Sequence, residues 1–443
     1  MERKSIMKKL TAFIEENLLP FAVKISNNIY LKAITRGFSE LLPVLIIGAL
    51  FTLIGSFNIP AYQQFVTSTG LKTIFMIIPA VSTNMFAVYT SFSVARALAD
   101  EKGYTKESVT IGILTILVFL LMIPVVTMKS DSGASSLVLP TTFLGAPGLF
   151  SAMILGLIVP SIYGIFISRN IGIKMPQSVP PMISRSFSAI VPAFFIGFLF
   201  AVVRFLFSIT KYGDFNSFIY GLLKSPLMKL GASPMTFFVL IFLSSTLWFF
   251  GIHGGMVVGP FITILYAQSG LENLAAFAAG TALPNIISPS VWLTYASLGG
   301  VGGSIGLALC LAFIAKSKRY RTLGKLSLPG VLCSINEPIT FGLPYVLNTI
   351  TLIPMILVPI ATFGLSYALT VAGILPRLNG MAIPLGTPVI MSGFLSGGWK
   401  VALWQIALIG VQFIIYLPFF KVLDAEALKM ESDEIEEEAD ATV

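Results

Sequence analysis

Long apolar stretches recur along almost the whole chain, and they constrain its fold more than any other feature of the sequence. Hydrophobic residues make up 56% of the 443 residues and charged residues only 11%, and the mean hydropathy is +0.89. A soluble chain of this size needs about 25% charged residues to cover its surface. The sequence therefore predicts an all-α, polytopic membrane protein.

The predicted spans follow from the length that a membrane crossing requires, which is about 20 mostly apolar residues. Lys and Arg gather on the cytoplasmic side, and this rule orients most of the loops with both termini in the cytoplasm. One further crossing is needed between the sixth and seventh stretches, so we expect about ten transmembrane helices. The directly recognisable stretches are 38–57, 73–98, 109–127, 143–167, 187–210, 235–251, 299–315, 350–373 and 399–421.

Two other stretches, 252–298 and 327–348, contain many Gly and Pro residues and predict two re-entrant hairpins. The first is about twice as long as one crossing needs, and we expect Asn285 within it to bind a ligand. The second has arms of about ten residues, which are too short to span, so it enters from the cytoplasm with Glu337 near its tip. Irregular backbone is tolerated at membrane depth only where it is buried in protein or lines a polar cavity.

The two ends of the chain differ from its middle. Residues 1–32 mix lysines with apolar residues and predict an N-terminal amphipathic helix on the cytoplasmic face, with a poorly ordered basic leader as the alternative. Residues 424–443 form an acidic cytoplasmic tail. Between them, a loop at 211–234 divides an N-terminal membrane domain, 33–215, from a C-terminal domain, 216–423.

Glu337 is the only charged residue between Lys325 and Arg377, in a strongly apolar region. Burial of an ionised carboxylate is so costly that such groups are usually paired, protonated or functional. One alternative is a carboxylate that caps backbone amides at a helix end, which Pro338 partly supports because proline is favoured at the first helical position. A carboxylate at the start of a half-helix is also how transporters build substrate sites.

His253 is the sole histidine of the chain, and Gly254 and Gly255 follow it. The alternative to a functional role is a histidine that is hydrogen-bonded within a helix bundle. The glycines let backbone or ligand approach closely, and Trp248 offers an aromatic surface nearby. We expect the His253 and Glu337 stretches to meet around a hydroxyl-rich ligand, which they bind or from which they help to remove a proton.

Three other features predict no chemistry of their own. The glycine run 299–306 lacks the spacing and the lysine of a phosphate-binding loop, so we expect close helix packing through Gly302 and Gly306. Cys310 and Cys333 have no metal-like spacing, and we expect no metal site. The basic residues lie between apolar spans, which argues against nucleic-acid binding.

Two stretches carry a resemblance to a known family: Ile252-His253-Gly254-Gly255 and, about 80 residues later, Ile335-Asn336-Glu337-Pro338-Ile339-Thr340-Phe341-Gly342-Leu343-Pro344. They resemble the paired signatures of the EIIC membrane component of the bacterial phosphoenolpyruvate-dependent sugar phosphotransferase system, within its lactose/cellobiose/diacetylchitobiose family. The resemblance covers essentially the whole chain. One departure is Thr349, where the family pattern has Pro.

The resemblance implies a homodimer in the bacterial cytoplasmic (inner) membrane, formed through the first five spans, whose C-terminal domain carries the sugar by a rigid-body, elevator-like motion. It implies that a phosphocysteine of the EIIB partner phosphorylates the 6-hydroxyl of a β-linked disaccharide. Glu337 is then the base or orienter, and His253 a partner that stabilises developing charge. The remaining residues expected to contact the sugar are Asn336, Trp248, Gly254, Gly255 and Asn285.

The partners expected from the resemblance lie on the cytoplasmic side. The chain ends in a short acidic tail and both cysteines lie in apolar stretches, so we expect EIIB to be a separate chain. EIIA acts upstream, phosphoenolpyruvate is the ultimate donor, and no other cofactor is expected. Residues 316–321 and the loop after Arg169 are candidate EIIB docking surfaces, with a role in topology alone as the alternative.

Two other classes of protein stay open. In a proton-coupled secondary transporter, Glu337 and His253 would relay protons and the sugar would leave unmodified. In a membrane scaffold or receptor that transports nothing, the glycines would serve packing only. The preference for diacetylchitobiose or cellobiose depends on a small difference in the pocket that the sequence does not specify.

Overall fold

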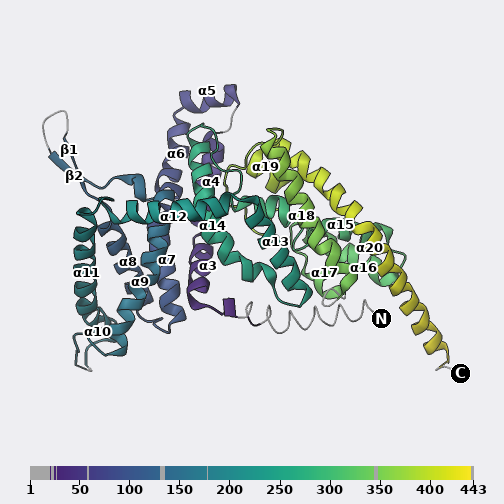
Figure 1. Ribbon diagram of the computed structural model, residues 1–443, viewed down its shortest axis with the longest axis horizontal. Helices are drawn as coiled ribbons and strands as arrows, with labels where there is room; N and C mark the ends of the chain where they lie inside the picture. Colours follow the sequence, from purple (N-terminus) through teal and green to yellow (C-terminus); the bar gives the residue numbers. More distant parts are fainter. Residues whose placement is uncertain are drawn as a thin grey trace. The chain divides into compact units, whose positions relative to one another are not determined.

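The computed structural model describes residues 20, 24–25, 27–56, 59–129, 135–176, 178–343 and 348–440, and these are mostly helical (Figure 1). The predicted N-terminal amphipathic helix at 1–32 lies largely outside the described residues. In chain order the helices are α3 (Ile29–Glu40), α4 (Leu42–Ser56), α5 (Pro60–Ser68), α6 (Leu71–Val81), α7 (Phe86–Glu101), α8 (Ser108–Leu121), α9 (Leu149–Ser168), α10 (Pro181–Ser188), α11 (Ile190–Ser208), α12 (Phe215–Ala232), α13 (Pro234–Phe249), α14 (Gly254–Ala278), α15 (Ile305–Leu309), α16 (Lys318–Leu332), α17 (Glu337–Gly342), α18 (Thr349–Val371), α19 (Met391–Gly397) and α20 (Trp399–Asp440).

Short elements join these helices. An antiparallel hairpin of β1 (Val126–Lys129) and β2 (Ser135–Val138) pairs Val126 with Val138, so the all-α prediction misses one small sheet. The 3-10 turns are Thr83–Met85, Thr141–Phe143 and Ala146–Gly148, and the π-helical turns are Trp292–Ala296 and Cys310–Ile314. The predicted loop at 211–234 is largely helical, because it contains α12.

Six helical segments in the described part of the chain are long and apolar enough to cross a membrane. They are Leu71–Glu101, Ala146–Ser168, Pro181–Ser208, Gly254–Ala278, Ile350–Val371 and Trp399–Asp433. The pair α3 and α4, bent by 45°, makes a seventh if it is one span. Three shorter apolar helices, at Ser108–Leu121, Pro234–Phe249 and Ile305–Ile314, fall where three more spans were predicted. The prediction of a polytopic helical membrane protein is confirmed, whereas the number of ten spans stays a prediction.

The predicted span at 299–315 is shorter than expected. Its helical part begins at Ile305 and ends at Ile314. Gly299, Gly300, Gly302 and Gly303 precede it with positive φ values of 83°, 96°, 76° and 63°, a backbone region that glycine adopts without strain. The run up to Gly303 is therefore a loop, but the predicted close packing is present: a Cβ at Gly302 would lie 2.6 Å from the Met355 side chain of α18, and one at Gly306 would run into the backbone of α20.

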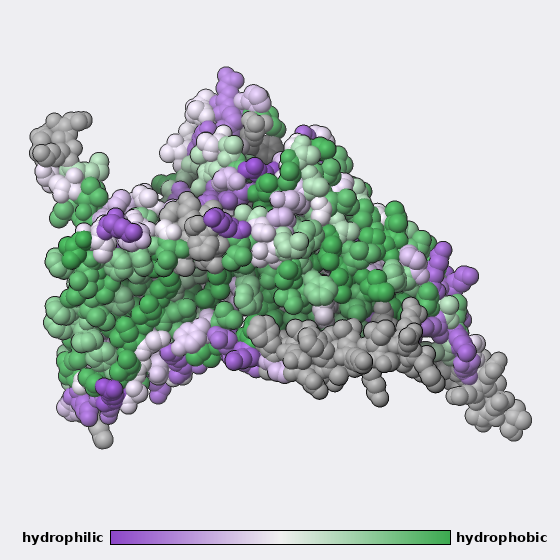
Figure 2. Space-filling model, viewed as in Figure 1, coloured by the Kyte–Doolittle hydropathy of each residue, from purple (hydrophilic) through white to green (hydrophobic). Residues whose placement is uncertain are grey.

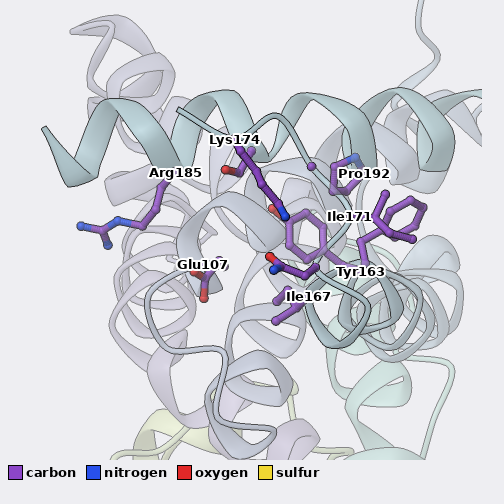
Figure 3. A pocket seen from close by; sticks show the side chains of 11 residues that line it. Glu107, Tyr163, Ile167, Ile171, Lys174, Arg185 and Pro192 are labelled. Carbon is purple, nitrogen blue, oxygen red and sulfur yellow. The ribbon is translucent and has the colours of Figure 1, made fainter. Parts of the chain in front are cut away.

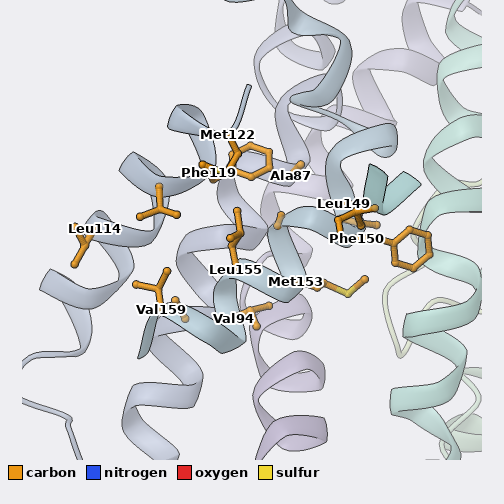
Figure 4. Close-up of a cluster of buried hydrophobic side chains, with 14 of the residues drawn as sticks. Ala87, Val94, Leu114, Phe119, Met122, Leu149, Phe150, Met153, Leu155 and Val159 are labelled. Atoms are coloured by element: carbon orange, nitrogen blue, oxygen red, sulfur yellow. The ribbon is translucent and has the colours of Figure 1, made fainter. Parts of the chain in front are cut away.

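The described chain forms two compact units, one from the residues up to Leu230 with Gly259–Leu271, and one from Gly231–Val258 with Glu272 onward. In the first unit α7 packs against α3, α8 and α9. A Cβ at Gly37 would lie 2.8 Å from the Val94 side chain, and one at Gly156 3.0 Å from it. These small residues let the helices approach around Val94, among the apolar side chains of Figure 4.

The outward face of α11 is strongly apolar. Phe194, Phe198 and Phe205 are 74%, 62% and 63% exposed, and Figure 2 shows a nearly continuous hydrophobic surface on the side where α8 and α11 lie. Such a face is expected where a helix meets lipid or another apolar surface rather than water.

In the second unit, α20 supports irregular backbone through polar side chains on one face. Gln405 and Gln412 are fully buried. Gln405 donates to the Thr294 carbonyl at 2.9 Å and Gln412 to the Leu298 carbonyl at 3.0 Å, while the Tyr416 hydroxyl donates to the Gly302 carbonyl at 2.7 Å. Because each bond satisfies a backbone group outside regular helix, the segment 292–306 is stable inside the unit.

Candidate functional site

His253 lies at the N-terminal end of α14 and caps it. Its Nδ1 accepts a hydrogen bond from the Met256 backbone N–H at 3.2 Å. A neutral imidazole that accepts at Nδ1 carries its hydrogen on Nε2, so this bond assigns the tautomer. The side chain is exposed. His253 therefore offers a hydrogen-bond donor, Nε2–H, to an approaching ligand.

The neighbours of His253 hold its ring in place. The rings of Trp248 and His253 lie 4.6 Å apart between centroids at 51°, and Trp248 is only 7% exposed. A Cβ at Gly254 would run into the Ser244 carbonyl oxygen, whereas one at Gly255 would meet only the His253 ring, at 3.3 Å. Trp248 and Gly254 thus position the imidazole, and their predicted contact with sugar stays a prediction, as does that of Gly255.

Glu337 is the first residue of α17 and follows a tight turn after α16. Ser334 in this turn has φ of 61°. Asn336 is 6% exposed, and its Nδ2 donates to the Val301 carbonyl at 2.9 Å and to the Ser304 hydroxyl at 2.6 Å. A Cβ at Gly300 would lie 2.5 Å from Asn336. Asn336 therefore anchors the turn to the glycine loop, and whether it also contacts sugar stays a prediction.

The Glu337 side chain is exposed, so the expectation of a buried carboxylate is wrong. The reason is the face of the helix: Asn336, Ile339 and Thr340 are the buried residues, and at about 100° per residue Glu337 lies at the edge of this buried face, where its side chain reaches the surface. No hydrogen bond or ion pair joins its carboxylate to another described residue. The alternative of a carboxylate that caps backbone amides is thus not supported.

The Glu337 stretch is bonded to the glycine loop, and α13, the helix before His253, borders the same loop. Ser244 and Ser245 of α13 face Ser297 and Val301 across a cavity of about 10 Å³, and Val301 also accepts the bond from Asn336. Among the residues that the structure describes, no hydrogen bond joins His253 to Glu337. Their predicted meeting around a ligand stays a prediction.

Asn285 lies in the segment after α14 and is already bonded within the protein. Its Nδ2 donates to Glu272 at 2.9 Å, and Asn273 bonds to the Asn285 backbone in both directions, at 2.9 and 2.8 Å. Arg377 donates to the Leu283 and Pro284 carbonyls at 2.6 and 2.7 Å. These contacts hold this segment, and sugar binding by Asn285 stays a prediction.

One candidate docking surface, the loop after Arg169, borders a cavity of about 210 Å³ in the first unit. In Figure 3 Lys174 points into this cavity toward Tyr163, near Glu107, whereas Arg185 points away from it. The cavity thus presents both signs of charge rather than a basic patch. EIIB docking at this loop and at 316–321 stays a prediction.

Several supporting residues were missed by the sequence analysis. They are Gln405, Gln412 and Tyr416 on α20, and Asp424 and Glu431 further along it. The spacings of seven and four residues place the first three on one helix face. Glutamines at this spacing inside an apolar span could have predicted these supporting bonds from the sequence, because a polar amide in such a span requires a partner.

Long apolar helices, an interrupted second unit and polar groups at the starts of helices define a multi-pass membrane protein built like a transporter. The family described as "Phosphotransferase system, EIIC" matches residues 35–359. The chain belongs to this family, and the resemblance found in the sequence is confirmed. Pro344 of the second signature and the side chain of Thr349 lie outside the described residues.

Two known relatives and one solved structure match this chain along nearly their full length. The lichenan permease IIC component of Bacillus subtilis (strain 168) is 32% identical over 437 residues, 96% of each chain. The PTS system cellobiose-specific EIIC component of Geobacillus stearothermophilus is 33% identical over 99% of this chain and 98% of its own length. The crystal structure of the transporter ChbC, the IIC component of the N,N'-diacetylchitobiose-specific phosphotransferase system, matches with a TM-score of 0.88 and 32% identity, covering 95% of this chain and 99% of that one.

Proposed function

We propose that this protein binds a β-linked disaccharide of the cellobiose or diacetylchitobiose type and carries it across the bacterial cytoplasmic membrane. It then presents the sugar 6-hydroxyl to phospho-EIIB for phosphorylation. The names of the relatives, which include permeases for lichenan and cellobiose and the diacetylchitobiose component, support this substrate class. The membrane component itself needs no cofactor beyond the phosphoryl group brought by EIIB.

The observation that carries this proposal is the complementary state of the two candidate residues. Nδ1 of His253 is engaged with Met256, so Nε2–H is a donor. Glu337 has an exposed carboxylate without a partner among the described residues, and it is an acceptor. A sugar hydroxyl is both donor and acceptor, so one hydroxyl can use both groups at once.

In the proposed transfer, Glu337 takes the hydroxyl proton as general base. The sugar oxygen forms a bond to phosphorus while the phosphorus–sulfur bond of the EIIB phosphocysteine breaks, leaving a thiolate. His253 donates to the sugar oxygen and orients it without accepting the proton. This assignment favours Glu337 as the base, because the neutral tautomer of His253 has no free acceptor nitrogen.

The wider architecture is proposed with the function. It comprises ten spans, two re-entrant hairpins, cytoplasmic termini and an elevator-like movement of the sugar-bearing domain, 216–423. The six candidate spans of the described chain, or seven if the bent pair α3 and α4 is one span, together with the three shorter apolar helices, support the number of spans. The helical hairpin of α16 and α17 has the expected short second arm, from Glu337 to Gly342. The exposed phenylalanines of α11 support burial of the 33–215 domain in lipid or in a homodimer.

The test is sugar phosphorylation by membrane vesicles that contain this protein, with a purified phospho-EIIB of the cellobiose type and labelled disaccharide. We expect phosphorylated sugar inside the vesicles, in an amount that an uncoupler does not change. Uptake of unmodified sugar that collapses with the uncoupler would show a proton-coupled transporter instead. Sugar binding without either activity would favour the receptor.

A further inference from the structure

We propose that Asp424 and Glu431, on the part of α20 that continues past the apolar segment, position the hairpin that carries Glu337. They do so by holding the N-terminal end of α16, the helix that leads into the Glu337 turn. The consequence for catalysis rests on the proposed function of Glu337. The contacts themselves do not depend on it.

Asp424 binds the chain just before α16. The side chain is 6% exposed. Its Oδ2 accepts from the Lys316 backbone N–H at 2.9 Å, and its Oδ1 accepts from the N–H groups of Lys316 and Ser317 at 3.1 and 3.0 Å. A carboxylate that accepts several backbone bonds in a buried position is held firmly and is costly to remove.

Glu431 continues the same contact two helical turns further on. One carboxylate oxygen accepts from the Ser317 hydroxyl at 2.6 Å and from the Arg319 N–H at 3.1 Å, and the other from the Lys318 N–H at 3.3 Å. Ser317 also caps α16 by accepting from the Tyr320 N–H at 3.1 Å. The first amides of α16, which have no partner within the helix, are thus satisfied largely by α20. Two negative charges also lie at the positive end of the helix dipole.

The contact is relayed to the Glu337 turn by α16 itself. This helix has 15 residues, so it spans roughly 22 Å at about 1.5 Å per residue. Gly324 packs on the backbone of Leu311 and Ala312 too closely to admit a side chain. At its far end, the Leu332 carbonyl accepts from the Val389 N–H at 2.8 Å. A helix fixed along its side and at both ends transmits its position to the turn that follows.

The two carboxylates add to an α20 that is already fixed. Gln405, Gln412 and Tyr416 hold the apolar part of this helix through separate bonds. Loss of Asp424 or Glu431 should therefore leave the unit folded while it releases the start of α16 and, through α16, loosens the turn that carries Glu337. Figure 2 shows hydrophilic residues on the C-terminal part of α20.

The test compares Asp424→Ala and Glu431→Ala with Glu426→Ala in the purified full-length protein. Glu426 is an exposed acid on the same helix that takes no part in these bonds among the described residues. Hydrogen exchange is measured by mass spectrometry on peptides covering 316–322 and 333–340. We expect exchange in both peptides to become about tenfold faster or more in the first two variants, because bonds to charged groups are lost, and unchanged in the control.

Phosphorylation kinetics form the second readout. We expect kcat to fall about tenfold or more with KM for sugar nearly unchanged, because small displacements of a catalytic group reduce rate more than binding. Asp424→Asn, which keeps one carbonyl acceptor, should recover part of the loss. If Asp424→Ala fails to fold, the partly exposed Glu431 decides the outcome alone.

Faster exchange confined to 316–322, with 333–340 unchanged, would overturn the proposal, because the carboxylates would then be only a helix cap. If the wild-type protein transfers no phosphate, the proposed function is wrong. Faster exchange at 333–340 in the variants would still support the positioning role of the two carboxylates. The two failures are therefore distinguishable.

Discussion

His253 and Glu337 both stand at the start of a helix, yet the structure treats them differently. His253 is tied down: Met256 bonds its Nδ1 and Trp248 packs on its ring. Glu337 has no such contact with the described residues, and its neighbour Asn336 makes the bonds that fix the turn. One site residue is positioned through its own side chain and the other through its backbone.

The difference separates a donor that its neighbours hold in one orientation from an acceptor whose carboxylate forms no hydrogen bond or ion pair with the described residues. A donor held at one nitrogen keeps its tautomer and its direction, which suits a group that orients a substrate. A carboxylate on an anchored turn can change its rotamer without disturbing the fold. Substitutions of either residue, or of the groups that hold it, test the two sides of this difference separately.

The largest effect is expected for Glu337→Gln. The amide keeps the shape of the side chain but cannot take a proton, so we expect phosphorylation to fall about 10²- to 10⁴-fold, the usual contribution of a general base. Rates are measured with phospho-EIIB, and sugar affinity by calorimetry serves as the control and should change little. Near-normal phosphorylation would remove Glu337 from the chemistry and leave it as a binding group at most.

His253 variants separate orientation from proton transfer. His253→Ala removes both the donor and the cap of α14, and we expect a loss of about 10²- to 10³-fold in kcat, as for other single donors to a reacting oxygen. His253→Gln keeps an N–H donor and should retain more activity than His253→Ala. If the two variants are equally inactive, the donor assignment is wrong and His253 acts as a base.

Gly254 and Gly255 form a matched pair on the His253 side. A Cβ at Gly254 meets the Ser244 backbone, which cannot move aside, whereas at Gly255 it meets only the edge of the His253 ring. Gly254→Ala should lower the free energy of unfolding by about 1–3 kcal/mol through overpacking, and Gly255→Ala by less. Thermal unfolding of both purified variants measures this. Equal stability with loss of sugar binding only in Gly255→Ala would assign Gly255 to the ligand.

Asn336→Ala tests the anchor on the Glu337 side. It leaves the Val301 carbonyl and the Ser304 hydroxyl without this donor, which costs about 1–3 kcal/mol for a buried polar group. We expect lower thermal stability together with reduced phosphorylation, because the Glu337 turn loosens. Unchanged stability with weaker sugar binding would instead make Asn336 a ligand residue.

The membrane class and the family could be predicted from the sequence, because both depend on features that a single stretch displays. Apolar length marks spans such as 143–167, which α9 matches closely. The two signatures lie in short contiguous stretches. The structure of residues 299–306 was harder to predict, because a glycine run is equally suited to helix packing and to a loop. Only the φ values distinguish the two structures.

The exposure of Glu337 could not be predicted, because hydropathy reports the surroundings of a segment and not the face on which one residue lies. The partners of Asn336 and Asp424 are 32 to 35 and 107 to 108 residues away in sequence. Such distant pairings follow from how the helices pack, which apolar periodicity leaves open. The tautomer of His253 depends in the same way on a single backbone amide.

The smallest effect is expected at Ile390, on the segment that contacts the end of α16. Ile390 has φ of 77°, a conformation that costs a β-branched residue about 1–3 kcal/mol. Its N–H nevertheless bonds to Gln405 at 2.8 Å, so Gln405 holds this strained residue in place. Glycine adopts the same backbone without strain, and Ile390 is 42% exposed. Ile390→Gly should therefore change the free energy of unfolding by less than about 1 kcal/mol.

Val389→Gly is the matched control for this prediction, because Val389 is only 7% exposed and its loss removes about 1.5–3 kcal/mol of apolar burial. Thermal unfolding and phosphorylation are measured for both variants. If the Ile390→Gly variant is as stable as the wild type but no longer supports sugar phosphorylation, the strained backbone at Ile390 holds the end of α16 in the position that catalysis requires. The turn that carries Glu337 would then be held by the 389–390 segment as well as by Asn336. Only the Glu337 carboxylate itself would be free to change its rotamer.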